Sequence, residues 1–256
     1  MDLKEYQEAK FELAELLRSA TPTYDAVPSA LSRAFSDLFS RLAEDRFNLV
    51  VVGRFNRGKT SVMNAILGTE RLPTGVVPLT SVITTVSYGS NECVFIDYES
   101  HRLPHRIALD ALPDYVTQRG NPGNSRGVAV ARVELPADLL RRGFHFVDTP
   151  GLGSSIIENT RTTERFLPEA DAFVLVTSYD SPLSEEELLL LRGLGPTAGR
   201  TFLLINKHDM LSPEERAEVL GHIRQQVEQV SVCARPQIFS VSAHQRSRSQ
   251  QNARPR

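Results

Sequence analysis

The residues with the most specific chemistry form a glycine-framed loop, Gly53-Arg-Phe-Asn-Arg-Gly58-Lys59-Thr60. The loop follows the apolar run 47–52 and leads into residues 61–67, which have the spacing of an amphipathic helix. Backbone N–H groups in such a loop, together with the N-terminus of the following helix, can surround phosphate groups. In this pattern the lysine reaches the β- and γ-phosphates of a nucleotide, and the threonine hydroxyl takes a position on Mg²⁺.

The order of strand, loop and helix therefore predicts a phosphate-binding loop rather than a surface turn that matches by chance. Gly53 and Gly58 stand where a Cβ would block the tight backbone path or the phosphate. The residues expected to line the phosphates are Gly53, Arg54, Phe55, Asn56, Arg57, Gly58, Lys59, Thr60 and Ser61.

A second motif, Asp148-Thr-Pro-Gly151, comes directly after the apolar run 144–147. A carboxylate at the end of a strand can hold the coordination shell of Mg²⁺, and the Gly151 N–H can contact a γ-phosphate. The alternative is that Asp148 only caps a helix. Because the motif follows a strand and lies downstream of the phosphate loop, we expect Asp148 and Gly151 to face the nucleotide.

A third motif, Asn206-Lys-His-Asp209, follows another apolar run. The Asp209 carboxylate can accept hydrogen bonds from N1–H and the exocyclic amine of guanine, a pattern that adenine does not offer. Asn206 is expected to brace the phosphate loop, and the stem of Lys207 to stack on the base. The fourth motif, Ser240-Val-Ser242-Ala243, is informative only by its position, where a backbone N–H can read the guanine O6. Together these residues predict GTP rather than ATP.

Length and composition permit one large domain with appendages in the 256 residues. An apolar fraction of 41% can build a core, and the net charge of −2 argues against non-specific nucleic-acid binding. Cys93 and Cys233 have neither a CxxC partner nor a histidine cluster, which disfavours a metal centre or a disulfide. The N-terminal residues do not resemble a signal peptide, and no run approaches the ~18 apolar residues of a membrane span. We expect a cytoplasmic protein whose membrane contact, if any, is peripheral, at the inner face of the cell membrane.

The chain before the phosphate loop has the pattern of two helices, at 1–20 and 29–45. Their apolar stripes either pack on the domain or wait for a partner helix. After the loop helix, the residues of turn type at 89–92 predict a hairpin between strands 82–88 and 93–98. A helix over 107–118 and an edge strand over 128–135 are expected next.

From residue 144 onwards, strands and helices alternate. The expected strands are 144–147, 172–177, 201–206 and 236–241, with a loop and helix extending to about 168. Capping boxes at Ser184 and Ser212 predict the starts of two further helices. This order predicts an α/β fold with a mostly parallel, doubly wound sheet, helices on both faces and an antiparallel extension from 82–98.

Three regions follow from this interpretation: N-terminal helices at 1–45, a nucleotide-binding domain at 46–243 and a polar tail at 244–256. The tail is rich in Gln, Ser, Asn and Arg and is expected to be disordered. Its arginines either touch an anionic surface or form a solvated end with no specific role.

The four motifs in this order resemble those of the TRAFAC-class P-loop GTPases. The segments 72–81, 115–118, 121–124 and 148–154 narrow the resemblance to the GTPase domain of bacterial dynamin-like proteins. It covers roughly residues 40–243, and helix 1–20 is placed like the helix that joins the neck of such proteins. The resemblance implies a P-loop GTPase fold, GTP and GDP as ligands and Mg²⁺ as cofactor.

The resemblance also assigns Thr80 as the switch-one threonine that binds Mg²⁺ and positions water, with Thr74, Ser81 and Thr84 as competitors. Leu152 stands where Ras-like enzymes have a glutamine, so other groups must orient the water. Dynamin-like enzymes do so with loop backbone, the switch threonine and a monovalent cation, when two domains meet across their nucleotide faces.

Three loop side chains keep two interpretations each. Asn56 either helps to bind K⁺ or Na⁺ or only makes hydrogen bonds within the loop. Arg54 and Arg57 either reach a partner's phosphates or are solvated, and we expect them to be solvated.

Where the family continues into a neck, a stalk and a membrane-binding tip, this sequence has only the polar tail after Ala243. The chain is expected to be either a fragment or a shortened relative, so membrane remodelling does not carry over. We expect a GTPase that forms GDP and phosphate, with Lys59, Thr80 and Asn56 in catalytic roles and self-association through the nucleotide face. The rival is a nucleotide-dependent binding module that hydrolyses little and docks on a longer dynamin-like partner. A third and weaker interpretation is an ATPase.

Overall fold

The structure is a computed structural model that describes residues 3–20, 46–74, 82–99, 102–150, 170–194, 199–230 and 235–244, with only the backbone of 3–7 and 20. The chain divides into two units, residues 1–47 and 48–256, which are described separately. The expected helix 29–45, the helix after Gly151 and the polar tail beyond His244 lie outside the described residues.

The first unit contains one described helix, α1 (Leu3–Ala20), as the sequence predicts. Phe11 and Leu16 are each 65% exposed, whereas Leu17 is buried. Across all described residues, none of the helices is long and apolar enough to span a bilayer.

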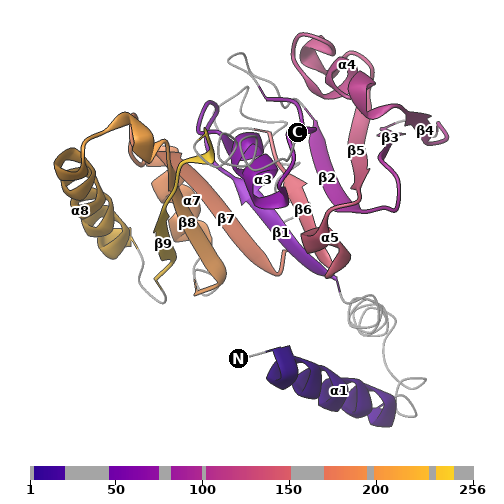
Figure 1. Cartoon of the computed structure of the whole chain (residues 1–256), viewed down its shortest axis with the longest axis horizontal. Helices are drawn as coiled ribbons and strands as arrows, with labels where there is room; N and C mark the ends of the chain where they lie inside the picture. The colour runs from indigo at the N-terminus through magenta and orange to yellow at the C-terminus, as the bar shows by residue number, and fades with distance from the viewer. Residues whose placement is uncertain are drawn as a thin grey trace, which may run out of the picture. The chain divides into compact units, whose positions relative to one another are not determined.

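The second unit is built on one nine-stranded sheet, with the strand order β4-β3-β5-β2-β6-β1-β7-β8-β9 (Figure 1). On one side β1, β7, β8 and β9 are successively parallel. On the other side β2 runs parallel to β5 but antiparallel to β6, and β3 is antiparallel to both β5 and β4. The strands are β1 (Phe47–Val52), β2 (Ile83–Tyr88), β3 (Cys93–Tyr98), β4 (His105–Ile107), β5 (Val128–Leu135), β6 (Phe144–Asp148), β7 (Ala172–Ser178), β8 (Thr201–Asn206) and β9 (Gln237–Ser240).

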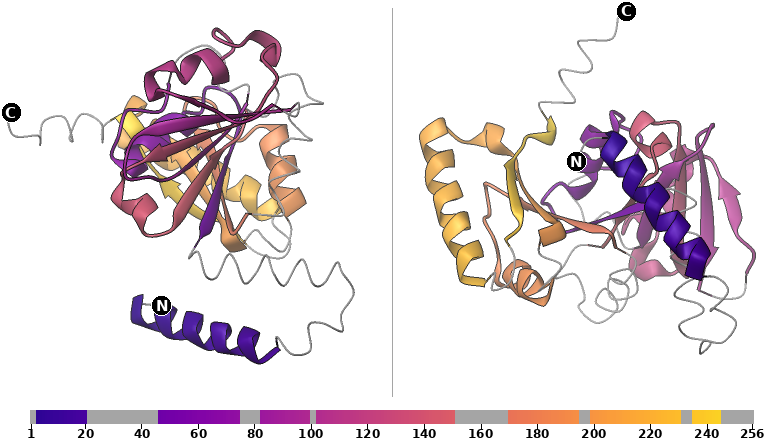
Figure 2. Two further views of the ribbon diagram at one scale, coloured as in Figure 1. Left: turned by 90° about the vertical axis from the view of Figure 1, so that its right-hand side faces the viewer. Right: turned by 90° about the horizontal axis from the view of Figure 1, so that it is seen from below.

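Helices cover both faces of this sheet, as expected (Figure 2). Met63 of α3 belongs to the apolar cluster that contains Val51 of β1, whereas Ile223 of α8 belongs to the cluster that contains Val52. Since neighbouring residues of a strand point to opposite faces, α3 and α8 lie on opposite sides of β1. The helices of this unit are α3 (Lys59–Leu67), α4 (Pro113–Val116), α5 (Asp138–Arg141), α7 (Glu185–Leu194) and α8 (Pro213–Val230), with 3₁₀ turns η2 (Leu109–Ala111), η3 (Pro122–Asn124) and η6 (His208–Met210).

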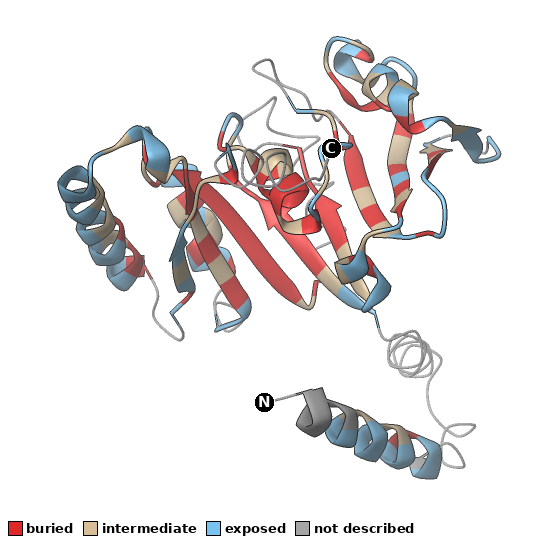
Figure 3. Cartoon of the chain, in the orientation of Figure 1, coloured by how far each residue is buried: buried red, intermediate tan, exposed pale blue. Residues whose placement is uncertain are grey.

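The centre of the sheet is buried on both faces (Figure 3). All seven residues of β7 are buried, and β1 is buried from Leu49 to Val52. These are the continuous apolar runs of the sequence, because a strand covered by helices on both sides needs no polar face. The central strands therefore give the loops at their ends a rigid base.

The antiparallel extension is present, but the predicted hairpin is wrong. Strands β2 and β3 do not pair, because β5 lies between them and pairs with both. The turn after β2 is real, and its Gly89 N–H donates to the carbonyl of Leu135 in β5 over 3.2 Å. A Cβ at Gly89 would lie 2.6 Å from the Cβ of Glu134, so glycine permits β5 to pass beside the turn. Strand β5 is thus internal rather than at an edge.

The expected helix over 107–118 is confirmed only in part, as a 3₁₀ turn followed by a short α-helix. Ile107 pairs with Val94 and belongs to β4. The chain then makes the turn η2 before Pro113 begins the four-residue helix α4. Proline lacks the N–H that a helix interior needs, so it begins a helix here instead of continuing one.

Both predicted capping boxes are confirmed. The Ser184 N–H donates to Glu187 Oε2 over 2.9 Å, and the Glu187 N–H donates to Ser184 Oγ over 3.3 Å. Ser212 and Glu215 make the same reciprocal bonds over 2.8 and 3.2 Å at the start of α8. The starts of α7 and α8 are therefore determined by residues close to each other in the sequence.

Gly221 in the middle of α8 offers a test of the helix energetics. An added Cβ would meet nothing within 4 Å, so Gly221→Ala should raise the free energy of unfolding by roughly 1 kcal/mol through helix propensity alone. Urea denaturation followed by circular dichroism measures this, and Gly193→Ala in α7 is an equivalent second position. A loss of stability in both variants would contradict the packing described for α7 and α8.

Candidate nucleotide-binding site

The four sequence motifs meet at one edge of the sheet. The phosphate loop follows β1, Asp148 ends β6, Asn206 ends β8 and Ser242 follows β9. Because β1, β7, β8 and β9 are parallel, the carboxyl ends of β1, β8 and β9 share this edge. The hydroxyl of Thr149, just after β6, donates to the Val51 carbonyl over 2.9 Å and holds the end of β6 beside β1. Ligands of open α/β sheets bind at such an edge.

The phosphate loop takes a backbone path that requires glycine at both ends. Gly53 has φ 140°, and a Cβ there would lie 2.3 Å from the carbonyl oxygen of Val176. Gly58 has φ 84°, and its Cβ would lie 2.5 Å from Asn206 Nδ2. Asn56 between them is also left-handed, at φ 63°, a conformation that asparagine tolerates better than most residues.

Lys59 is buried and folds back over the loop. Its Nζ donates to the carbonyls of Gly53 and Arg54 over 3.0 and 3.3 Å. Burial lowers the pKa of Lys59, and the nearby carboxylates of Asp148 and Glu187 oppose this shift. The ammonium group is therefore held against backbone oxygens at the point where the motif places the phosphates.

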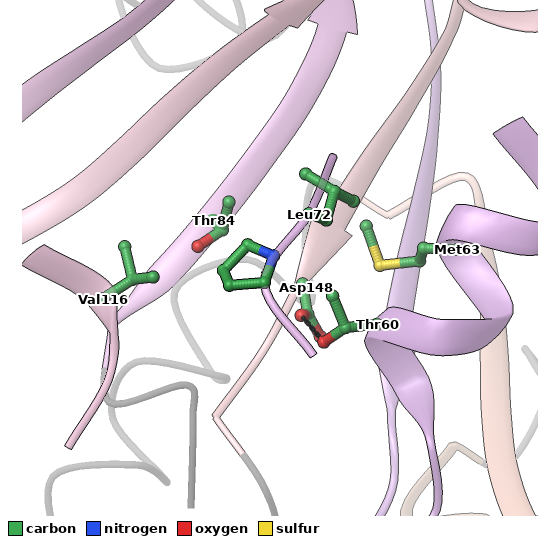
Figure 4. A pocket seen from close by; sticks show the side chains of 7 residues that line it. Thr60, Met63, Leu72, Thr84, Val116 and Asp148 are labelled. Atoms are coloured by element: carbon green, nitrogen blue, oxygen red, sulfur yellow. Dashed lines mark hydrogen bonds between the residues drawn. The ribbon is translucent and has the colours of Figure 1, made fainter. Parts of the chain in front are cut away.

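Thr60 and Asp148 lie together at one end of a small pocket (Figure 4). The Thr60 hydroxyl donates to Asp148 Oδ2 over 2.8 Å. Asp148 Oδ1 is buried and has no hydrogen-bond partner among the described residues. Burial raises the pKa of Asp148, against the opposing effects of the Lys59 charge and the Thr60 hydrogen bond.

These residues fit a magnesium ion. A hydroxyl and a carboxylate oxygen without a partner are the hard oxygen ligands that Mg²⁺ prefers, directly or through its bound waters. No cluster of three or more metal-ligating side chains occurs among the described residues. A magnesium ion at this position would complete its coordination shell with phosphate oxygens and water.

The competing switch-one hydroxyls fall into three groups. Thr80 and Ser81 lie outside the described residues, as does Gly151 of the second motif. Thr74 is exposed and is the last described residue before the segment that contains Thr80 and Ser81. Thr84 is 5% exposed, sits in β2 opposite Asp148 and lines the same pocket as Thr60. A residue paired in a central strand cannot move as a switch does, so Thr84 is a wall of the pocket.

Asn206 connects the two halves of the site. Its Nδ2 donates to the carbonyl of Arg57 over 3.0 Å, and its Oδ1 accepts from the N–H of Ala243 over 3.1 Å. One buried amide therefore ties the phosphate loop to the fourth motif. In this structure the Ala243 N–H is engaged with Asn206, so that group contacts the protein rather than facing outward.

The third and fourth motifs also meet through Asp209. Ser242 Oγ donates to Asp209 Oδ1 over 2.5 Å, and this bond lowers the pKa of Asp209 below its ordinary value. Lys207 has a left-handed backbone, and its Nζ lies 2.8 Å from Asp180 Oδ2. An ionised acceptor at position 209 and an ordered lysine stem beside it are the groups that a guanine site requires.

The expectation for the loop arginines is wrong for Arg57. Its side chain is 6% exposed and forms an ion pair with the fully buried Glu187. It therefore has no route to a partner's phosphates in this conformation. Arg54 is 42% exposed, and its Nε lies 4.0 Å from the exposed Glu186. The side chain of Asn56 is exposed, and its role stays a prediction.

Two further residues, Phe55 and Ser61, are also predicted to line the phosphates. Phe55 is 36% exposed at the tip of the loop, and Ser61 is half-buried in the first turn of α3.

Comparison with known proteins decides the family. Residues 49–208, more than half of the chain, match the Dynamin family. The chain belongs to the dynamin family. The matched segment is a P-loop GTPase domain of the dynamin kind, and the bacterial dynamin-like resemblance of the sequence is confirmed.

Several relatives show how far the likeness extends. A protein described as "Uncharacterized protein in xynA 3'region" from Caldicellulosiruptor sp. is 35% identical over 84% of this chain and 53% of its own length. The bacterial dynamin-like protein of Nostoc punctiforme is 28% identical over 78% of this chain and 31% of its own. A probable chloroplastic transmembrane GTPase, FZO-like, of Arabidopsis thaliana is 30% identical over 91% of this chain and 22% of its own. The chain thus spans about half or less of these relatives.

The fold agrees as well. A chain from a solved structure of "an oligomerised bacterial dynamin pair" superposes with a TM-score of 0.69 and 17% identity, over 94% of this chain and 47% of that chain. This match confirms the dynamin-like α/β fold. It also spans about half of the larger protein.

The dynamin-family domain uses two side chains that sequence reasoning missed. Asn64 of α3 is buried, and its amide pairs with the backbone of Leu72 by donating to the carbonyl over 2.9 Å and accepting from the N–H over 3.1 Å. This contact fixes the chain where it leaves α3 toward Thr80. Glu187 contacts the phosphate loop, as described above. Asn64 could have been found from the sequence, because it is a polar residue on the apolar face of a predicted helix. Glu187 was missed because its place in the capping box already explained why a glutamate stands there.

Gly58→Ala tests the closeness of the loop to Asn206. Alanine at φ 84° costs roughly 1–2 kcal/mol of stability, and its Cβ would also displace the Asn206 amide. We expect the affinity for guanine nucleotides to fall about tenfold to a hundredfold, since the broken contacts are buried and polar. Titration with a fluorescent GTP analogue measures the loss.

Gly123→Ala is the matched control, because Gly123 also has positive φ but its added Cβ would meet nothing within 4 Å. It should lose similar stability and keep its nucleotide affinity. Equal affinity in both variants would show that the contact between Gly58 and Asn206 does not shape the site.

Proposed function

We propose that this chain binds GTP with Mg²⁺ and hydrolyses it to GDP and phosphate. In the reaction, water attacks the γ-phosphorus in line, the bond from that phosphorus to the β–γ bridging oxygen breaks, and one proton is released. The observation that carries the proposal is the Asn206 amide, because it joins the phosphate loop to the guanine-reading motifs in one rigid unit.

Specific roles follow from the site. Lys59 exchanges one of its loop carbonyls for a phosphate oxygen, and the loop N–H groups cradle the phosphates. Asp209 accepts from guanine, while Lys207 packs along the base. Thr60 and Asp148 hold Mg²⁺, with Thr80 as a further ligand. When bound, Mg²⁺ neutralises charge on the phosphate oxygens. The Gly151 N–H contacts the γ-phosphate.

The groups that position water are supplied in part by self-association. Leu152 cannot hydrogen-bond to water, and Arg57 is engaged with Glu187. A K⁺ or Na⁺ ion held by the exposed Asn56 amide would supply positive charge next to the loop, and a second copy of the domain would enclose it. A chain of similar fold comes from an oligomerised bacterial dynamin pair, which supports self-association of this domain.

The decisive experiment is GTP turnover against protein concentration, from below to well above micromolar, in K⁺ and again in Na⁺. Specific activity should rise with concentration and depend on the cation. Lys59→Ala, checked for folding by circular dichroism, serves as the blank. If the chain binds GTP but its turnover does not exceed that of the Lys59→Ala blank, the proposal that it is a GTPase is wrong. That outcome would favour a nucleotide-dependent module that docks on a longer dynamin-like protein.

Base specificity provides a second prediction. Asp209→Asn replaces an acceptor by an amide that cannot pair with both guanine donors, so the affinity for GTP should fall about a hundredfold or more. Xanthosine triphosphate, which carries an oxygen in place of the exocyclic amine, should then bind better than GTP. Competition titrations measure both.

The exposed Glu214→Gln in the first turn of α8 is a carboxylate-to-amide control and should leave the preference for guanine unchanged. Equal binding of ATP and GTP by the unaltered protein would contradict the assignment of Asp209.

A further inference from the structure

Glu187 is a carboxylate with no solvent exposure that lies against the phosphate loop. Arg57 Nε and Nη2 donate to its two oxygens over 3.2 and 3.3 Å. The two donors of one guanidinium thus bind both carboxylate oxygens, the geometry in which arginine holds a carboxylate most firmly. The pair joins the loop to the first turn of α7.

Two backbone donors complete the environment of this carboxylate. The Arg54 N–H donates to Oε1 over 3.3 Å, and the Ser184 N–H donates to Oε2 over 2.9 Å. An ionised carboxylate can accept about four hydrogen bonds, and all four are present here. Three of them come from the phosphate loop, so Glu187 fixes both a side chain and the backbone of that loop.

The segment that carries Glu187 is itself anchored to the site. We call residues 178–187 the bridging segment. Its Ser178 Oγ accepts from Arg57 Nη1 over 3.2 Å, and its Tyr179 N–H donates to the Asn206 carbonyl over 3.0 Å. Asp180 pairs with Lys207. The bridging segment therefore contacts both the phosphate loop and the third motif, which begins at Asn206.

A buried ion pair is seldom needed for stability, since apolar residues of similar volume often serve as well. What apolar residues cannot supply is the set of directed bonds to the Arg54 N–H and to the Arg57 guanidinium. We propose that Glu187 is a positioning residue that holds the phosphate loop in the shape that binds phosphate. This inference rests on the proposed function, because the ligand of the loop is taken to be GTP.

Glu187→Gln is the first test, because glutamine also forms a capping box and so keeps the start of α7 intact. The variant loses the charge that pairs with Arg57. We expect its affinity for GTP and GDP to fall about tenfold to a hundredfold, the range for a lost hydrogen bond to a charged group. Affinity for guanosine, which has the base but no phosphate, should change less than twofold.

Glu186→Gln is the matched control, since this neighbouring carboxylate is exposed and lies 4.0 Å from Arg54, beyond hydrogen-bond distance. It should bind all three ligands as the unaltered chain does. A Glu187→Gln variant that binds GTP normally, or that loses guanosine and GTP equally, would overturn the positioning role.

An apolar pair separates positioning from folding. Arg57→Met combined with Glu187→Leu removes both charges together and leaves no unpaired ion. The thermal unfolding temperature should fall by only a few degrees, because Glu187→Leu also removes the capping box of α7. The affinity for GTP should nevertheless fall at least about tenfold, because the bond to the Arg54 N–H is also gone. Normal GTP affinity in a stable double variant would refute the inference.

Hydrogen exchange distinguishes this inference from the proposed function. In the nucleotide-free chain, the Arg54 amide should exchange faster in Glu187→Gln than in Glu186→Gln. If the unaltered chain binds no guanine nucleotide, the proposed function fails. The exchange rates then still decide whether Glu187 holds the loop. Equal exchange in the two variants would refute the role of Glu187 whatever the ligand proves to be.

Discussion

The site depends on one buried amide. Asn206 donates to the loop that follows β1 and accepts from the backbone that follows β9. Because Asn206 itself ends β8, a side chain fixed by the central sheet sets the distance between the phosphate loop and the fourth motif. The glycine at position 58 is a consequence of that arrangement, since any Cβ there would occupy the place of the amide.

Charges are concentrated around the same loop and are compensated in pairs. Lys59 and Asp148 influence each other's pKa, while Arg57 and Glu187 form an ion pair on the side of α7. Burying ionised groups is costly unless they are paired and hydrogen-bonded. The domain thus buries a cluster of charges, at a cost in folding free energy, where a polyanionic ligand is expected to bind.

Local signals account for most of what the sequence predicted correctly. The central strands, the loop helix, α7 and α8 follow from apolar runs and capping boxes that involve neighbouring residues. The hairpin at 82–98 failed because a turn signal cannot reveal that a third strand, β5, inserts between the two. Arg57 was misjudged for the same reason, since its partner Glu187 lies 130 residues away. The placement of Thr80 and Gly151 stays a prediction.

The separation of these contacts in sequence has a consequence for synthesis. Asn206 lies 149 residues beyond Arg57. At translation rates of roughly 5–20 residues per second, the loop waits about 7 to 30 seconds on the ribosome before that partner is made. During this interval the loop lacks the contact that shapes it, and the half-made sheet exposes the apolar edges of its central strands. The loop and the fourth motif therefore reach the arrangement described here only after residues 206–243 have been synthesised.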